Sequence, residues 1–240
     1  MASVIDPNPP AVAPGLPGEP APLWFLIPEG FFALPLAASP QERAHRADAF
    51  VRELYSRGSE DIWRPAAPYY AAIAELLADT GISYAAMGLF STSDEDFTEQ
   101  GEVARHALSE GAAQCVLTLA AVPTGQPHGE TDVVAQGIAA ALRTDSLNDV
   151  RWLDLPCGPA VACISWRQFP IRPEATADGS ETEVVTAQLQ VHVPFPTAPF
   201  TAVFTMLTAY VDHWQQFCEM TEAILQTLSF TDPAGTEDSP

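Results

Sequence analysis

The chain contains no lysine, and all ten of its basic residues are arginines. A catalytic Schiff base, the phosphate-binding lysine of a P-loop and a Ser-Lys dyad each require a lysine amine, so these three kinds of site are excluded. Positive charge is scarce overall, because 10 basic residues stand against 31 acidic ones and the formal net charge is -21. Nucleic acids and anionic lipids bind basic patches, so we expect neither as a partner.

Long hydrophobic runs and a secretory leader are also missing. No run of about 18 apolar residues occurs, so we expect no membrane insertion. The first residues lack a basic region followed by an apolar core, which favours a cytoplasmic location. The cysteines lie within predicted strands, a turn and a helix, without the spacing of a disulfide framework, and this is typical of reduced thiols. They are Cys115, Cys157, Cys163 and Cys218.

The composition is that of a globular chain, with 47% hydrophobic and 17% charged residues in 240. Residues 1–21 are rich in proline and poor in residues that a core buries, so we predict a disordered tail there. A second disordered tail, acidic, is predicted at 232–240. Between them we predict a single α+β domain, residues 22–231, interrupted by an acidic, solvated excursion at 91–111.

The segment from Val184 to Phe230 carries the clearest pattern. Apolar residues occupy every second position from Val185 to Phe195, with His192 on the polar side, which predicts a half-buried strand. Phe200 to Leu207 is apolar or threonine throughout, which predicts a strand covered on both faces. A helical stripe follows, with Asp212 as its expected cap. Its inward residues are Trp214, Phe217, Cys218, Ile224, Leu225 and Leu228.

The remaining elements are predicted from the same periodicities and from their end signals. Ser39, Pro40 and Glu42 form a capping-box start for a helix that continues through Tyr55 to Gly58, which is expected to end it. Further helices are expected at Pro65–Asp79, with Tyr69, Ile73, Leu76 and Leu77 inward, and at Thr131–Leu142, with Val133, Val134, Ile138, Ala141 and Leu142 inward. Strands are expected as a short pair within Leu23–Leu34, and at Ile82–Phe90, Gln114–Val122, Val150–Leu155 and Ala160–Trp166.

This order of elements resembles the PsbP-like αβα sandwiches of actinobacteria, whose familiar branch is the LpqN type. Three stretches carry the resemblance: FLIPEGFFAL, VRWLDLPCGPAVACISW, and VTAQLQVHVPFP followed by AVFTMLT and the final helix. The resemblance covers roughly residues 23–230. It implies a mostly antiparallel sheet of about six to eight strands flanked by helices, in a family of binding or accessory modules. The chain lacks the lipobox cysteine of the LpqN type, so an envelope anchor is not carried over.

One thiol is a candidate nucleophile. Cys157 lies in a Pro-Cys-Gly-Pro turn, and a cysteine enzyme would need a base beside it, for which His192 or His213 are the candidates. A zinc site built from Cys157, Cys163 and a histidine is disfavoured, because the spacing matches no standard ligand pair. We therefore predict no cofactor and no metal.

The hypothesis favoured by the sequence is a non-enzymatic interaction or accessory module in the cytoplasm. Its acidic composition predicts a protein partner with a basic surface and binding that weakens as salt rises. Two alternatives stay open. One is a small enzyme that uses Cys157 with His192 or His213, and the other is a self-assembling subunit joined through an exposed edge strand.

Overall fold

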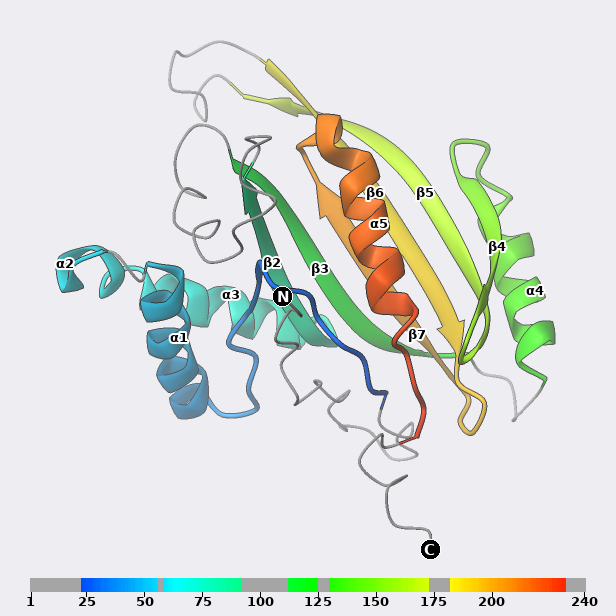
Figure 1. Ribbon diagram of the computed structural model, residues 1–240, viewed down its shortest axis with the longest axis horizontal. Coiled ribbons are helices and arrows are strands. Elements are labelled where there is room, and N and C mark those ends of the chain that lie inside the picture. The colour runs from blue at the N-terminus through cyan, green and yellow to red at the C-terminus, as the bar shows by residue number, and fades with distance from the viewer. Residues whose placement is uncertain (1–22, 56–57, 92–111, 125–129, 173–181, 232–240) are drawn as a thin grey trace, which may run out of the picture.

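The computed structural model describes residues 23–55, 58–91, 112–124, 130–172 and 182–231. Within them, seven strands form one antiparallel sheet in the order β1-β2-β3-β7-β6-β5-β4, and helices lie on both of its faces (Figure 1). The predicted α+β class is therefore confirmed. The strands are β1 (Phe31–Ala33), β2 (Ile82–Ser91), β3 (Ala112–Pro123), β4 (Asp149–Leu155), β5 (Gly158–Ile171), β6 (Thr182–Pro194) and β7 (Phe200–Thr208).

The predicted tails at 1–21 and 232–240 lie outside the described residues, as does nearly all of the acidic excursion at 91–111. Two short strands were expected within Leu23–Leu34, but only β1 belongs to the sheet. The earlier part of that segment makes a single bridge, in which the backbones of Trp24 and Ser229 pair. The prediction of a strand pair there is wrong, because the first segment pairs with the end of the chain.

The segment at 184–208 forms the centre of the sheet, as strands β6 and β7. Its predicted alternation is confirmed, since the apolar side of β6 is buried from Ala187 to Phe195. Strand β7 also pairs with β3, where Phe204 lies opposite Leu119. This pairing joins the sheet strands of the first half of the chain to those of the second half.

Helix α5 (Trp214–Leu225) covers one face of the sheet, together with the segment around Phe25. The ring of Phe25 meets that of Phe204 edge-on, with centroids 5.5 Å apart. The predicted stripe of α5 is confirmed at Phe217, Ile224 and Leu225, which are buried. The predicted Asp212 cap is wrong, because a 3-10 turn (η4, Val211–His213) leads into the helix and no side chain caps it.

Helices α1 (Pro40–Leu54), α2 (Glu60–Trp63) and α3 (Ala67–Asp79) lie at the β1–β2 end of the sheet. The Ser39 cap is confirmed, because its hydroxyl accepts a hydrogen bond from the backbone N–H of Glu42 at 3.2 Å. Phe50 of α1 packs against Tyr70 of α3 and contributes to a small core that includes Leu89 of β2.

The inward face predicted for the second helix is partly wrong. Tyr69 and Leu76 are 65% and 66% exposed, whereas the buried residues of α3 are Ala67 and Ala74. The helix lies close to α1, and a close approach of two helices is made through small side chains. The periodicity found the helix but not the side that faces the protein.

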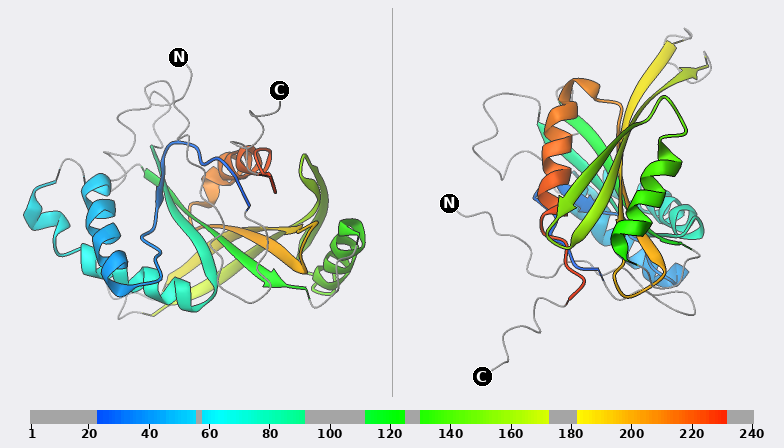
Figure 2. Two further views of the ribbon diagram at one scale, coloured as in Figure 1. Left: turned by 90° about the horizontal axis from the view of Figure 1, so that it is seen from below. Right: turned by 90° about the vertical axis from the view of Figure 1, so that its right-hand side faces the viewer.

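Helices α3 and α4 (Thr131–Leu142) lie on the sheet face opposite α5, one toward each end (Figure 2). Between them the sheet face is only partly covered. Val116 of β3 and Leu207 of β7 lie directly opposite each other there and are 38% and 40% exposed. The prediction that β7 is covered on both faces is therefore wrong for this part of the strand, because neither helix reaches across it.

Candidate functional site

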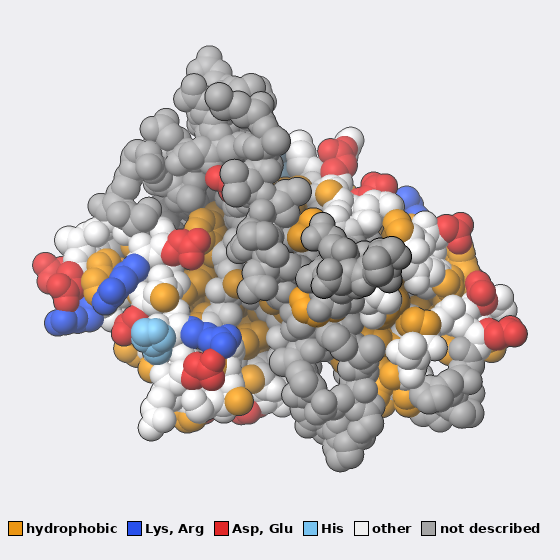
Figure 3. All heavy atoms as spheres, turned by 60° about the horizontal axis from the view of Figure 1, so that its bottom comes forward, with side chains coloured by type: hydrophobic (Ala, Val, Ile, Leu, Met, Phe, Trp, Pro, Cys, Tyr) orange, Lys and Arg blue, Asp and Glu red, His pale blue; other side chains and the backbone are white. Residues whose placement is uncertain are grey.

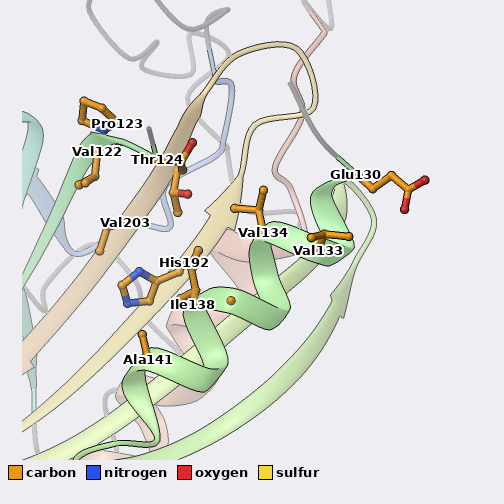
Figure 4. Close-up of a pocket in the computed structure, with 12 residues that line it drawn as sticks. Val122, Pro123, Thr124, Glu130, Val133, Val134, Ile138, Ala141, His192 and Val203 are labelled. Carbon is orange, nitrogen blue, oxygen red and sulfur yellow. The ribbon is translucent and has the colours of Figure 1, made fainter. Parts of the chain in front are cut away.

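A pocket of about 870 Å³ opens where α4 stands over the sheet (Figure 4). Its size is within the range of pockets that hold small molecules. The sheet contributes the ends of β3 and β7 and one residue of β6, and α4 contributes the facing wall. The lining residues are Val122, Pro123, Thr124, Glu130, Val133, Val134, Gly137, Ile138, Ala141, His192, Thr201 and Val203.

Helix α4 contacts the sheet mainly through its small residues, with Ile138 and Leu142 packed beside them, and turns Val133 and Val134 toward the pocket. Ala135 and Ala139 are buried against Val161 of β5. Val133, by contrast, lines the pocket and is 60% exposed. The sequence predicted that Val133, Val134, Ile138, Ala141 and Leu142 would face inward. Ile138 and Leu142 do pack against this small core, but the prediction is wrong for Val133 and Ala141, which are exposed and line the open pocket.

Two polar side chains form part of the sheet side of the pocket. His192 of β6 lies opposite Val203 of β7, and Thr201 is two residues before Val203, so both side chains share one face of the sheet. Thr201 is 3% exposed. The hydroxyl of Thr201 and Nε2 of His192 are both buried, and neither has a hydrogen-bond partner among the described residues.

Such atoms are uncommon in folded proteins, and each costs about 1–3 kcal/mol when it loses water without gaining a partner. The cost is removed if a bound molecule supplies the missing hydrogen bonds. Figure 4 shows the imidazole of His192 beside Val203 and facing Ile138 and Ala141 across the pocket. The imidazole of His192 is therefore next to the apolar wall that a ligand would contact.

Burial lowers the pKa of His192 from its ordinary value near 6.5, because the low-polarity surroundings disfavour the imidazolium. The ring is thus neutral at pH 7, and its Nε2 either donates or accepts one hydrogen bond according to the tautomer. The Thr201 hydroxyl does both. Together the two groups present neutral, adaptable hydrogen-bonding capacity to the pocket.

Glu130 is the sole charged residue among those that line the pocket. It lies just before α4, and Figure 4 shows its carboxylate extending away from His192. None of the described lining residues is an arginine. Apart from Glu130, the lining is therefore apolar except for three neutral polar side chains, those of Thr124, His192 and Thr201.

Gly137 is a notable member of the wall, because it lies within the helix. Glycine in a helix interior costs roughly 0.5–1 kcal/mol relative to alanine. No steric contact requires it here, since a Cβ at position 137 would meet no atom within 4 Å. The missing side chain leaves space at the pocket wall.

The structure does not bring the predicted cysteine and histidines together. Cys157 packs against the core on the α5 side of the sheet, whereas His192 faces the pocket on the other side. Burial raises the pKa of the Cys157 thiol, so the thiol is protonated at neutral pH. Within the described residues, Cys157 therefore has neither candidate histidine beside it, and its thiol is not the thiolate that a nucleophilic cysteine needs.

His213 lies at the opposite end of the sheet from Cys157. It precedes Trp214, whose ring is 5.4 Å from that of Trp166. Trp166 and Cys157 are nine positions apart along an extended strand, which corresponds to about 30 Å. Of the three candidates, His192 alone lines the pocket.

The proposed cysteine ligands of a zinc site are also separated by the sheet. Cys163 shares a face with Val161 and His192, opposite the face that Cys157 packs against. Across the described ranges, no three histidine, cysteine or acidic side chains are grouped closely enough to hold a metal ion.

A second, more polar groove of about 620 Å³ lies between α1, α2 and α3. Its charged side chains largely satisfy one another: Arg43 pairs with Glu75, Arg64 pairs with Glu60, and Arg52 stacks 4.7 Å above the ring of Trp63. Figure 3 shows these basic and acidic side chains interspersed at the α1–α2 end of the molecule. This groove presents no unsatisfied group comparable to His192 or Thr201.

Sequence reasoning singled out His192 for a different role and missed Thr201 and the α4 wall. The sequence feature that could have revealed the pocket wall is Gly137, because glycine in the middle of a strongly patterned helix lowers helix stability.

The chain matches no model of a known protein family, and no curated protein matches it. Membership of the PsbP-like family therefore remains a prediction from the sequence.

Proposed function

We propose that this protein is a non-enzymatic binding module that holds a small, largely apolar molecule between α4 and the sheet. The observation that carries the proposal is the combination in one pocket of an exposed apolar helix wall with two buried polar atoms that lack partners. A core contact would bury Val133 and satisfy Thr201, and neither is the case. A ligand with an apolar body and one polar end would bury Val133 and supply a hydrogen bond to Thr201.

A larger side chain on the α4 wall of the pocket tests the proposal, because it would occupy the space of the ligand. Nile red, an uncharged apolar fluorophore, is titrated into the full chain and its fluorescence increase gives the dissociation constant. In Gly137→Leu the new side chain points into free space at the wall, so we expect at least tenfold weaker binding. Gln136→Leu is the matched control, because Gln136 is exposed, neighbours Gly137 and does not line the pocket.

Equal affinity in the wild type and in Gly137→Leu would contradict binding at this pocket. Circular dichroism establishes that both variants remain folded. Native mass spectrometry of the protein from its own cells, before any denaturing step, then gives the mass of a ligand carried through purification.

A protein partner with a basic surface is the second candidate, and it is supported by the charge of -21 and the lack of lysine. Exposed charges are screened over about 8–10 Å at physiological salt, so binding to such a partner should weaken from 50 to 500 mM sodium chloride. Affinity capture from lysate at both concentrations tests this. A complex that survives unchanged at high salt would contradict charge-driven recognition.

We also propose a reducing compartment, such as the cytoplasm. The four cysteines are all free, and Cys115 and Cys163 are buried as small apolar residues. None of the described helices is long and apolar enough to cross a membrane. Fractionation of cells with an antibody against the protein measures its location directly.

A further inference from the structure

The polar groups of the pocket define the kind of ligand end that it would hold. Thr201 and His192 are on neighbouring strands and are diagonal neighbours on one face, a relation in which residues are separated by about 7–8 Å. Both residues line the pocket, so one polar end group placed between them would address both. A hydroxyl or a carbonyl next to a hydroxyl would pair with the Thr201 hydroxyl and with Nε2 of His192.

The charge around these two groups selects against ionised ligands. Among the residues that the structure describes, no arginine lines the pocket, and lysine is absent from the chain, so a carboxylate would lose its water without gaining a cation. A ligand ammonium placed at His192 would be equally unpaired, because the one lining carboxylate, Glu130, extends away from that ring. An uncharged end group avoids both penalties.

We propose that the pocket selects uncharged ligands that carry a hydroxyl or carbonyl at one end of an apolar body, and that it rejects the corresponding carboxylates. The apolar body lies against Val133, Val134 and Ile138 of α4. The polar end lies at Thr201 and His192. This proposal rests on the proposed function, since it specifies the chemistry of the ligand at the same site.

Three ligands that differ only at the polar end test the selection: butylbenzene, 4-butylbenzyl alcohol and 4-butylbenzoate. Their affinities for the full chain are measured at pH 7.5 by ligand-detected NMR titration. We expect 4-butylbenzyl alcohol to bind at least tenfold more tightly than 4-butylbenzoate and more tightly than butylbenzene. An affinity for 4-butylbenzoate equal to or above that for the alcohol would overturn the proposal, as would equal affinities for the alcohol and butylbenzene.

Two variants locate the polar contacts. Thr201→Val and His192→Phe should each lower the affinity for 4-butylbenzyl alcohol about five- to tenfold, toward that of butylbenzene, while butylbenzene binding is retained. Thr205→Val is the matched control, because Thr205 is on the same strand and face but does not line the pocket. If neither Thr201→Val nor His192→Phe changes alcohol binding, the proposed contacts are wrong.

The outcomes separate this inference from the proposed function. If the three ligands fail to bind while Nile red still binds and is blocked by Gly137→Leu, the selection rule is overturned and the binding module stands. If Nile red binding is also insensitive to Gly137→Leu, the pocket is not a binding site and both proposals fall.

Discussion

Thr201 carries a buried polar group that is expected to lower the stability of the protein. Its hydroxyl is buried, has no partner within the described chain and faces a pocket. An unsatisfied buried hydroxyl lowers the stability of the ligand-free protein, because its hydrogen bonds to water are lost on folding. Valine has the same shape and no hydrogen-bonding group.

Thr201→Val should therefore raise the free energy of unfolding of the ligand-free protein by about 1 kcal/mol. Urea unfolding followed by circular dichroism measures the change, with Thr205→Val as the comparison. A loss of stability in Thr201→Val would show that the hydroxyl is satisfied, for instance by ordered water.

His192 should make stability depend on pH. Burial lowers its pKa in the folded protein below the value near 6.5 that applies in the unfolded chain. Below pH 6.5 the unfolded state therefore binds more protons than the folded state, and the stability contributed by the neutral ring is lost as pH falls through the folded pKa. Above pH 6.5 that contribution is fully present.

We expect wild type to lose more unfolding free energy between pH 7.5 and pH 5 than His192→Phe does, since phenylalanine cannot take up the proton. Urea unfolding at both values gives the two differences. Identical pH dependence in wild type and His192→Phe would mean that the ring is protonated equally in both states.

At the scale of the element, α4 shows what periodicity does and does not reveal. Its bounds, Thr131–Leu142, agree with the prediction at both ends, because the local pattern and the change of composition mark them. The side that meets the sheet was predicted only in part, since Ile138 and Leu142 do pack there, but Ala135 and Ala139 make the buried contact and Val133 lines the pocket. The pocket also depends on β3, β6 and β7, whose approach to α4 is set by pairings between distant segments.

Gly137→Ala should stabilise the protein by about 0.5–1 kcal/mol, because alanine is the better helix former and its methyl group meets no neighbour. Thermal unfolding followed by circular dichroism measures the gain as a rise in Tm. Nile red affinity should fall only slightly, in contrast to Gly137→Leu. A decrease in Tm would mean that glycine is needed for the shape of the helix.

The junction of α1 and α3 depends on one buried arginine. The guanidinium of Arg43 donates to the carbonyl oxygens of Ala37 and Ala38 at 2.8 and 3.3 Å, and to Oε1 of Glu75 at 3.0 Å. The Arg43 side chain is 10% exposed, whereas that of Glu75 is 58% exposed. Solvent weakens the ion pair, so the bonds to the two carbonyl groups matter more.

Arg43→Ala should cost about 2–3 kcal/mol of unfolding free energy, from lost charged hydrogen bonds and lost packing of the side chain. Glu75→Gln should cost less than about 1 kcal/mol. Urea unfolding of both variants measures the two losses of unfolding free energy and tests their order. The reverse order would show that the ion pair with α3, and not the contacts to the carbonyl groups before α1, supplies most of the stabilisation by Arg43.

At the scale of the whole molecule, the two edges of the sheet bear on self-assembly. Strand β1 has three residues, and β4 carries the Asp149–Arg151 ion pair together with Asp154. Short or charged edges disfavour pairing with another copy.

The alternation of β6 and the stripe of α5 were predictable from the sequence. The edges were not, because strand order depends on which distant strands pair.

We expect light scattering to give the mass of a monomer, 25.7 kDa, across the concentration range in which the protein is soluble. A concentration-dependent dimer would favour the self-assembly alternative. In that case Arg151→Glu, which places three acidic residues on the edge strand, should abolish the dimer if β4 forms the joint.

The contact between the first and last described segments bears on how the chain folds as it is synthesised. The backbone N–H of Leu26 donates to the Thr227 hydroxyl at 2.9 Å, across 201 positions of sequence. At about 5–20 residues per second, a ribosome needs roughly 10–40 s to make that stretch. Strands β1 to β3 therefore emerge well before β7 and α5, which complete their apolar face. We expect that apolar face to stay incomplete until the last helix has left the exit tunnel.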